Sequence, residues 1–178
     1  EVMDRQSVYH VHQDVSITYT GAELRAYDDE LVFLQVLEYG KRVPPGEPVT
    51  FTFYEICTDL DWPINKGYYD RVETCLTRMQ ATAVQFSSKR VGRLESLSLI
   101  SRFRILNKGN NATQRCQVEI DLDILYLFAG KYYSRFIWEP YRKLTPTARR
   151  LFDYFVTHKE PFPLSLESFK SLCGSDSN

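Results

Sequence analysis

Basic side chains that could bind phosphate groups are concentrated in one part of the sequence. Residues 64–115 contain ten basic residues and three acidic ones, whereas the rest of the chain contains 12 basic and 20 acidic residues. The formal net charge of −1 therefore conceals a positively charged segment. Because Lys and Arg neutralise DNA phosphates and a local positive field attracts nucleic acid, the segment predicts a DNA-facing surface. A solvated hairpin that happens to be basic is the alternative.

Other residue types could support catalysis or metal binding, but their spacing favours simpler roles. The sequence "DLD" occurs at 59–61 and 121–123 and could supply paired carboxylates to two metal ions. Charge at helix ends is the simpler interpretation. His10 and His12 lie two residues apart, and no third metal ligand is evident. Since nucleotide-binding and hydrolase motifs are also missing, we expect no enzymatic activity, no metal site and no cofactor.

The composition predicts a globular cytoplasmic protein. The chain has 178 residues, of which 43% are hydrophobic, and no apolar run approaches the ~20 residues that span a bilayer. No charged-then-apolar leader opens it. Four cysteines have no C-x-x-C spacing and are interpreted as buried free thiols: Cys57, Cys75, Cys116 and Cys173. The first residue is Glu1 and the last are "GSDSN", so we expect a fragment of a longer protein.

The basic residues must be positioned by a mixture of helices and strands. Alternating apolar residues predict strands, and helical spacing of apolar residues predicts helices. The predicted strands are 8–19, 49–53, 83–88, 97–106, 114–120 and 132–138. The predicted helices are 30–40, 54–60, 66–82, 121–130, 144–158 and 165–174.

Capping residues define a helix-turn-helix within residues 50–90. Asp28 or Asp29 can cap the helix that precedes it, and Thr52 with Glu55 has the spacing of a capping box. Asn65 can cap the longer helix that follows. The order strand, short helix, tight turn, longer helix and strand is typical of a helix-turn-helix followed by a wing. We therefore predict an α+β fold of the winged helix-turn-helix type.

The longer helix, 66–82, has two distinct sides. At ~100° per residue, Arg71 and Arg78 share one flank, roughly 10 Å apart. Asp70 and Glu73 lie on the polar face and argue against deep insertion into DNA, because phosphates would repel them. The apolar stripe is predicted to consist of Tyr68, Val72, Cys75, Leu76, Met79 and Ala83.

The C-terminal part begins to repeat this order. Thr145 can cap a helix with Pro146 at its first position, and a Pro-rich loop and a short helix follow. We therefore predict that a second helix-turn-helix begins here and is truncated before its second helix. The predicted organisation is an N-terminal arm at 1–20, a first winged-helix domain at 21–143, and the first half of a second at 144–178.

Several long segments resemble the TrfA family of plasmid replication initiators. The most specific are "DWPINKGYY", "CLTRMQATA" and "HKEPFPLSLE", within a collinear match from Gly21 onward. The resemblance implies two winged-helix domains that bind direct repeats, called iterons, in double-stranded origin DNA. It also implies opening of an adjacent A+T-rich segment, with contact to its single strands. The implied protein partners are the host initiator, replicative helicase and sliding clamp, together with a second copy of the chain in a monomer–dimer equilibrium; no membrane is involved.

The resemblance also indicates DNA-facing positions in this sequence. Those on or beside the longer helix are Lys66, Tyr69, Arg71, Thr74 and Arg78. Those in the following loop are Lys89, Arg90 and Arg93, and those in or beside the later hairpin are Lys108 and Arg115. The second domain's reading helix would lie beyond residue 178. A winged-helix transcription regulator and a winged-helix module for protein docking or dimerisation without DNA affinity remain alternatives.

Overall fold

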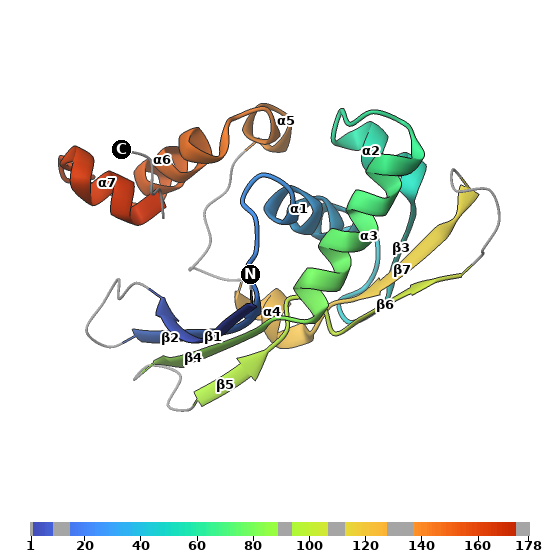
Figure 1. The fold of residues 1–178 in the computed structure, drawn as a ribbon, viewed down its shortest axis with the longest axis horizontal. Helices are drawn as coiled ribbons and strands as arrows, with labels where there is room; N and C mark the ends of the chain where they lie inside the picture. The colour runs from blue at the N-terminus through green and yellow to red at the C-terminus, as the bar shows by residue number, and fades with distance from the viewer. Residues whose placement is uncertain (1, 9–14, 89–93, 107–112, 128–136, 174–178) are drawn as a thin grey trace. The chain divides into compact units, whose positions relative to one another are not determined.

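A computed structural model describes residues 2–8, 15–88, 94–106, 113–127 and 137–173. The chain divides into two compact units, Glu1–Phe128 and Ala129–Asn178 (Figure 1). The predicted domain boundaries at 20/21 and 143/144 stay predictions. The candidate residues His10, His12, Lys89, Arg90, Arg93 and Lys108 lie outside the described part.

Unit 1 is a mixed α+β fold with two antiparallel sheets. The strand order is β1-β2-β4-β5 in one sheet and β3-β7-β6 in the other. Its elements are β1 (Val2–Val8), β2 (Val15–Ala22), α1 (Asp29–Gly40), β3 (Val49–Thr52), α2 (Phe53–Asp59), α3 (Lys66–Gln80), β4 (Ala83–Ser88), β5 (Leu94–Leu97), β6 (Arg102–Ile105), β7 (Arg115–Glu119) and α4 (Leu122–Leu127). The predicted α+β class is confirmed.

The four-stranded sheet contains the first strand pair and the strands that follow α3. β1 pairs with β2 in antiparallel register, with Val8 opposite Ile17. The prediction of one strand over 8–19 is therefore wrong, because an alternating pattern does not reveal a reversal of chain direction. β4 pairs with both β2 and β5, so the strands after α3 join this sheet.

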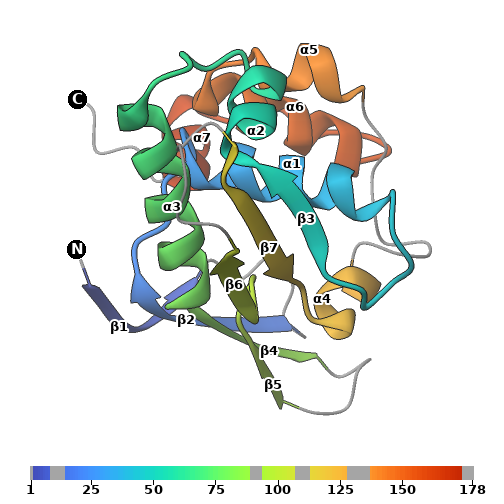
Figure 2. The same cartoon turned by 90° about the vertical axis from the view of Figure 1, so that its right-hand side faces the viewer.

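The three-stranded sheet combines β3, which precedes α2 and α3 in the sequence, with β6 and β7, which follow them. β7 is the central strand of this sheet (Figure 2). Phe51 of β3 lies opposite Cys116, and Phe103 of β6 lies opposite Val118. The predicted hairpin of β6 and β7 is confirmed. The predicted single strand 97–106 is wrong, because β5 and β6 belong to different sheets. The chain leaves one sheet after Leu97 and enters the other at Arg102.

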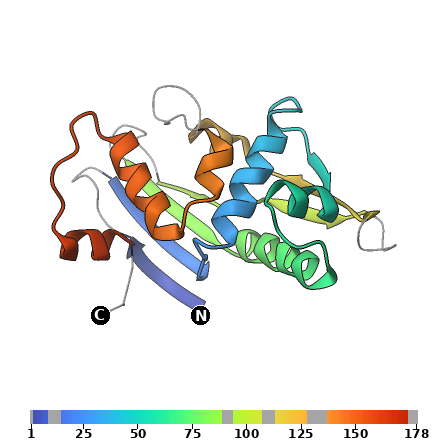
Figure 3. The same cartoon turned by 90° about the horizontal axis from the view of Figure 1, so that it is seen from above.

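Three helices pack together over an apolar core in unit 1. α3 contacts α1, α2, β2 and β6, and the three helices lie side by side in Figure 3. The core includes fully buried residues from each helix: Val32 and Val36, Ile56 and Cys57, and Val72, Cys75, Leu76 and Met79. The apolar stripes predicted from the sequence therefore face a common interior.

The predicted helix starts are mostly confirmed. The Glu55 backbone N–H donates to the Thr52 hydroxyl at 3.0 Å, and the Thr52 N–H donates to the Glu55 carboxylate at 2.6 Å, which completes the capping box of α2. At α3, the Tyr68 N–H donates to the Asn65 side-chain oxygen at 3.2 Å. α1 differs, because the side chain at its cap, Asp28, makes no capping hydrogen bond.

Unit 2 contains α5 (Trp138–Arg142), α6 (Pro146–Thr157) and α7 (Leu166–Cys173). The Ala148 N–H donates to the Thr145 hydroxyl at 3.3 Å, so the predicted start of α6 is confirmed. The predicted strand 132–138 is wrong at its described end, since Trp138 begins α5. α6 and α7 flank an apolar groove of about 510 Å³. None of the helices in the described residues is long and apolar enough to cross a membrane.

Candidate nucleic-acid interface

The turn between α2 and α3 fixes where α3 begins. The Asp61 N–H donates to the Thr58 carbonyl at 3.1 Å, and the Trp62 N–H donates to the Cys57 carbonyl at 2.8 Å. Asp61 has a φ of 54°, which is the left-handed conformation that ends many helices. These two bonds satisfy carbonyls at the end of α2 and reverse the chain within a few residues. α3 is consequently held against α2 as in a helix-turn-helix.

The inner face of α3 is apolar and closely packed. Val72, Cys75, Leu76 and Met79 are fully buried, as the sequence predicts. Tyr69 is also buried, at 5% exposure, and its ring stacks on Phe53 with a centroid distance of 6.1 Å. The expectation that Tyr69 faces DNA while Tyr68 is in the core is therefore wrong, because α2 covers the side of α3 on which Tyr69 lies.

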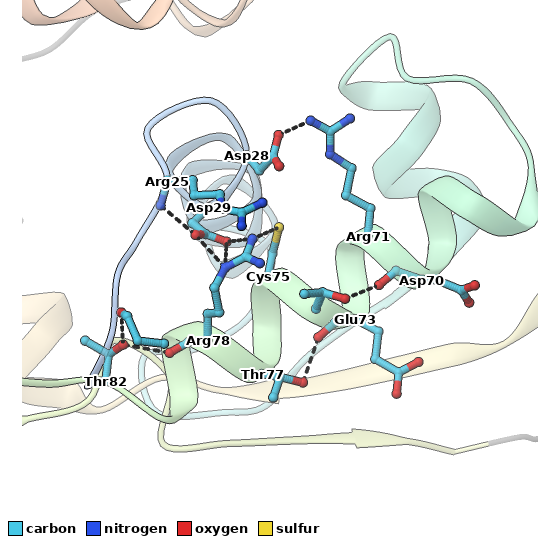
Figure 4. A network of polar contacts seen from close by, with 12 residues as sticks. Arg25, Asp28, Asp29, Asp70, Arg71, Glu73, Cys75, Thr77, Arg78 and Thr82 are labelled. Carbon is cyan, nitrogen blue, oxygen red and sulfur yellow. Dashed lines mark hydrogen bonds and ion pairs between the residues drawn. The ribbon is translucent and has the colours of Figure 1, made fainter. Parts of the chain in front are cut away.

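The outer face of α3 exposes more negative than positive charge. Lys66, Asp70, Glu73 and Thr74 are exposed. The Thr74 hydroxyl donates to the Asp70 carbonyl at 2.7 Å, and Asp70 and Glu73 form no ion pair within the described residues. Figure 4 shows these two carboxylates pointing away from the start of α1. Positive charge on α3 therefore comes from Lys66 at its start and from the arginines on its flank.

Arg71 lies on that flank, beside the start of α1. Its Nη2 atom donates to Asp28 in a salt bridge (Figure 4), and the side chains are 29% and 8% exposed respectively. The hydrogen bond to Asp28 raises the pKa of the Arg71 guanidinium above its ordinary value. Arg71 is thus a half-buried cation with a fixed partner.

Arg78, two turns later, is enclosed more completely. Its Nε and Nη2 atoms donate to the Asp29 carboxylate at 2.9 and 2.7 Å. The Asp29 side chain is 2% exposed and also accepts from the Arg25 backbone N–H at 2.7 Å. Arg78 contacts the Cys75 sulfur at 3.4 Å as well. The pair joins α3 to the chain that enters α1, which is a structural role that the sequence did not reveal.

The other predicted positions are distributed between exposed and undescribed parts of the chain. Arg115 is exposed at the start of β7. Two exposed basic residues outside the predicted set are Arg102 and Arg104 of β6, whose guanidinium groups lie 4.0 and 3.4 Å from Glu119. Their alternation with Phe103 and Ile105 could have indicated that both arginines face solvent, because a half-buried strand presents every second residue to solvent.

The aspartates and cysteines that could have supported metal or thiol chemistry are hydrogen-bonded or buried within the fold. Asp59 accepts from the Tyr39 hydroxyl at 2.6 Å, and Asp121 accepts from the Asp123 N–H at 2.9 Å. Burial raises the pKa of Cys57 to about 11 and that of Cys116 to about 12, so thiolate forms are scarce at neutral pH. Within the described residues, His, Cys, Asp and Glu do not gather in groups of three that could hold a metal ion.

Comparison with known proteins identifies the family. The family model described as TrfA protein matches residues 1–178. This chain belongs to the TrfA family. It is 62% identical over 177 residues to the "Plasmid replication initiator protein TrfA" of Escherichia coli. That match covers 99% of this chain and 46% of the relative, so the chain spans about half the relative's length.

Solved structures share the TrfA-family fold at low sequence identity. Crystal structures of domains 2 and 3 of RctB, one of them from selenomethionine derivatives, match with TM-scores of 0.63 and 0.62 at 11% identity. Each match covers 88% of this chain, and 66% and 64% of the RctB chains. The arrangement of elements described above therefore occurs in other proteins with little sequence in common.

Proposed function

We propose that this chain is the DNA-binding part of a plasmid replication initiator. The observation that carries this proposal is the 62% identity to a protein named plasmid replication initiator protein TrfA. The positive charge of residues 64–115 supports DNA as the ligand, because phosphate contacts by Lys and Arg supply much of the affinity for DNA.

We also propose that unit 1 is a winged helix. In that fold one strand lies between the first two helices, and two further strands form a hairpin after the third helix. α1, β3, α2, α3, β6 and β7 follow this order, and their strands form the sheet β3-β7-β6. The β4–β5 pair is then an additional hairpin rather than the wing. The wing is the β6–β7 hairpin, whose connection contains Lys108 and whose β7 begins at Arg115.

Charge positions suggest how DNA would lie on unit 1. Phosphates would be repelled by Asp70 and Glu73 on the outer face of α3 and attracted by Lys66, Arg115 and the basic β6 strand. Contacts to the DNA backbone position a protein on the duplex without reading its sequence. We therefore expect this chain to supply mainly backbone contacts, with base reading shared with the second domain that the family resemblance implies.

The wider activity follows the family resemblance. In this proposal the longer protein binds iterons, helps to open an A+T-rich segment, and brings in the host initiator, the replicative helicase and the sliding clamp. Monomers bind DNA and dimers restrain copy number. The protein acts without enzymatic activity of its own and without a cofactor, inside the cell where plasmid DNA resides.

Fluorescence anisotropy on labelled duplexes tests the DNA-binding proposal. The chain is titrated at several salt concentrations against a duplex with direct repeats from the origin of its plasmid and against a shuffled duplex of equal length and composition. We expect affinity for both duplexes to fall steeply with salt, because bound counterions are released from phosphates. Absence of binding at low salt by both this chain and a longer protein would refute the proposal.

Two further measurements separate the alternatives. Permanganate reactivity of unpaired thymines on supercoiled origin plasmid would detect strand opening by the longer protein, which a transcription regulator with the same fold would not produce. A protein-docking module would instead show partner binding that is insensitive to salt, without any DNA affinity.

A further inference from the structure

Three aromatic rings surround the guanidinium group of Arg71. Its Cζ atom lies 5.3 Å from the ring centroid of Tyr27, 5.0 Å from that of Trp62 and 5.4 Å from that of Tyr68. All three distances fall within the ~6 Å over which a cation is attracted to a ring face. With Asp28, the rings define what we call the Arg71 box: Tyr27, Asp28, Trp62, Tyr68 and Arg71.

The rings are supplied by three separate segments, each with a fixed backbone. Tyr27 lies in the turn before α1, Trp62 in the turn between α2 and α3, and Tyr68 in the first turn of α3. The Trp62 N–H donates to the Cys57 carbonyl at 2.8 Å, and the Tyr68 N–H donates to the Asn65 side chain at 3.2 Å. The helix-turn-helix therefore fixes the backbone at Trp62 and Tyr68, and the turn before α1 adds Tyr27 and Asp28.

The box fixes Arg71 while leaving part of its hydrogen-bonding capacity available. A guanidinium carries five N–H donors in a rigid fork. Within the described residues, only the Nη2 atom of Arg71 is bonded, to Asp28, and the side chain stays 29% exposed. Arg78 differs, because two of its nitrogens bind Asp29 and its side chain is 15% exposed.

We propose that Arg71 is a pre-oriented phosphate ligand and that Tyr27, Trp62, Tyr68 and Asp28 are the residues that position it. This inference rests on the proposed DNA-binding function and deepens it. A free arginine side chain loses rotamer entropy when it is fixed on binding, and the Arg71 box removes much of this cost before DNA arrives. Planar guanidinium groups suit phosphate oxygens, because their N–H groups lie in one plane and can bind two oxygens together.

The position of Arg71 favours a backbone phosphate over a base edge. Figure 4 shows Arg71 on the flank of α3 that faces Asp28, whereas Asp70 and Glu73 occupy another side of the helix. If α3 faces a groove of the duplex, as the second helix of a helix-turn-helix does, a side chain on this flank would meet the phosphates of the strand beside that groove. Asp28 neutralises part of the Arg71 charge, so the contact depends on orientation as well as on net charge.

The test compares variants by anisotropy on one duplex at several salt concentrations. For Arg71→Ala we expect affinity to fall about 3- to 10-fold and the salt slope to decrease by up to about one unit, the limit for a cation whose charge is not shared with Asp28. Arg42→Ala is the matched control, because Arg42 also lies over a ring, that of Tyr39 at 4.7 Å, at the other end of α1. We expect Arg42→Ala to change affinity by less than about 2-fold, which is within the range of general charge effects.

Positioning is tested separately, with a variant that keeps every charge. Tyr27 is 60% exposed, so Tyr27→Leu should fold normally while it removes one ring from Arg71. We expect about a 2- to 4-fold loss of affinity with an unchanged salt slope, because the cation remains but is less well fixed. Tyr54→Leu is the matched control, since Tyr54 is 49% exposed on α2. Arg71→Lys should behave like Tyr27→Leu, because it keeps the charge and loses the planar fork.

The outcomes distinguish this inference from the function on which it rests. If the unmodified chain shows salt-dependent DNA binding and Arg71→Ala changes neither affinity nor slope, the phosphate contact is refuted and DNA binding stands. If Arg71→Ala weakens binding and both Tyr27→Leu and Arg71→Lys bind like the unmodified chain, the positioning role is refuted. If neither this chain nor the longer protein binds DNA, the proposed function itself fails. Thermal melting of every variant identifies any loss of folding.

Discussion

Arg71 and Arg78 lie two turns apart on one flank of α3, and each binds one of two consecutive aspartates at the start of α1. Around Arg71, the N-terminal end of α3 is open to solvent and surrounded by Tyr27, Trp62 and Tyr68. Around Arg78, the C-terminal end is closed. Identical residue types with regular helical spacing therefore differ in their surroundings: Arg78 is enclosed in the fold, whereas Arg71 stays partly exposed and keeps donors for the proposed phosphate contact.

The closed end of α3 is joined to β2 as well as to α1. The Thr82 hydroxyl donates to the Arg78 carbonyl at 2.7 Å and also lies 3.3 Å from the Ala22 carbonyl. A Cβ atom added at Gly21 would lie 2.5 Å from the Ala81 carbonyl oxygen. Close backbone approach and a buried ion pair therefore occur together at this end of α3.

The largest expected effect comes from removing the buried arginine. Arg78→Ala leaves the Asp29 carboxylate buried without its guanidinium partner, and loss of one partner of a buried pair costs about 3 to 5 kcal/mol. We expect urea denaturation of the variant to show a loss of this order in the free energy of unfolding. A loss below 1 kcal/mol would show that Arg78 resembles Arg71 and would remove the contrast between the two ends.

The rate of thiol modification in Arg78→Ala shows which part of the fold loosens. Cys75 is fully buried and touches Arg78, and burial raises its pKa. In the unmodified chain we expect a thiol reagent at pH 8 to modify the half-buried Cys173 first. In Arg78→Ala we expect faster modification of Cys75, mapped by mass spectrometry, while the thiol of Cys116 on β7 serves as an internal control.

Gly21→Ala tests the close backbone approach of β2 to the C-terminal end of α3. Gly21 has a φ of 130°, which alanine adopts only with strain, and the added methyl group would clash with the Ala81 carbonyl. We expect destabilisation of about 2 to 3 kcal/mol by thermal or urea denaturation. Gly40→Ala is the matched control, because the nearest atom to its added Cβ is a Val49 methyl at 3.7 Å. Equal stability of the two variants would show that the approach of β2 to α3 is loose.

Local signals in the sequence predicted the helices and several of their caps. Thr52 with Glu55, Asn65 and Thr145 cap helices as expected, because capping bonds join residues three apart. The partners of Arg71 and Arg78 could not be predicted, since they lie 43 and 49 residues away in the sequence. Asp28 and Asp29 carried the local signature of a cap and are used instead for tertiary ion pairs.

Sheet membership was likewise beyond the reach of local patterns. The segment 97–106 alternates like one strand, yet β5 and β6 pair in different sheets. Alternation reports which side chains are buried and carries no information about which strand is the neighbour. The fold class was therefore predictable from the sequence, whereas the pairing that separates β4–β5 from β6–β7 was not.

At the open end, removal of the arginine should affect stability far less. Arg71 and Asp28 are 29% and 8% exposed, against 15% and 2% for Arg78 and Asp29, so water reaches this pair more readily and we expect Arg71→Ala to cost about 1 to 2 kcal/mol by urea denaturation. The prediction compares directly with Arg78→Ala under identical conditions. A cost as large as that of Arg78→Ala would assign both arginines to the fold, and the Arg71 box would then be a structural cluster.

The smallest expected effect on stability comes from Asp61, in the turn that carries Trp62 at the N-terminal end of α3. Asp61 adopts a left-handed conformation that glycine adopts without strain, so we expect Asp61→Gly to stabilise the fold by about 0.5 kcal/mol. Asp61→Asn is the control, because asparagine tolerates this conformation and keeps a polar side chain.

If the turn only connects the two helices, both variants should bind DNA like the unmodified chain. If the side chain of Asp61 also helps to fix Trp62 beside Arg71, Asp61→Gly should gain stability and lose DNA affinity with an unchanged salt slope. Urea denaturation and anisotropy on the same samples would separate these two outcomes. Only a role of Asp61 in fixing Trp62 predicts higher stability together with weaker phosphate binding.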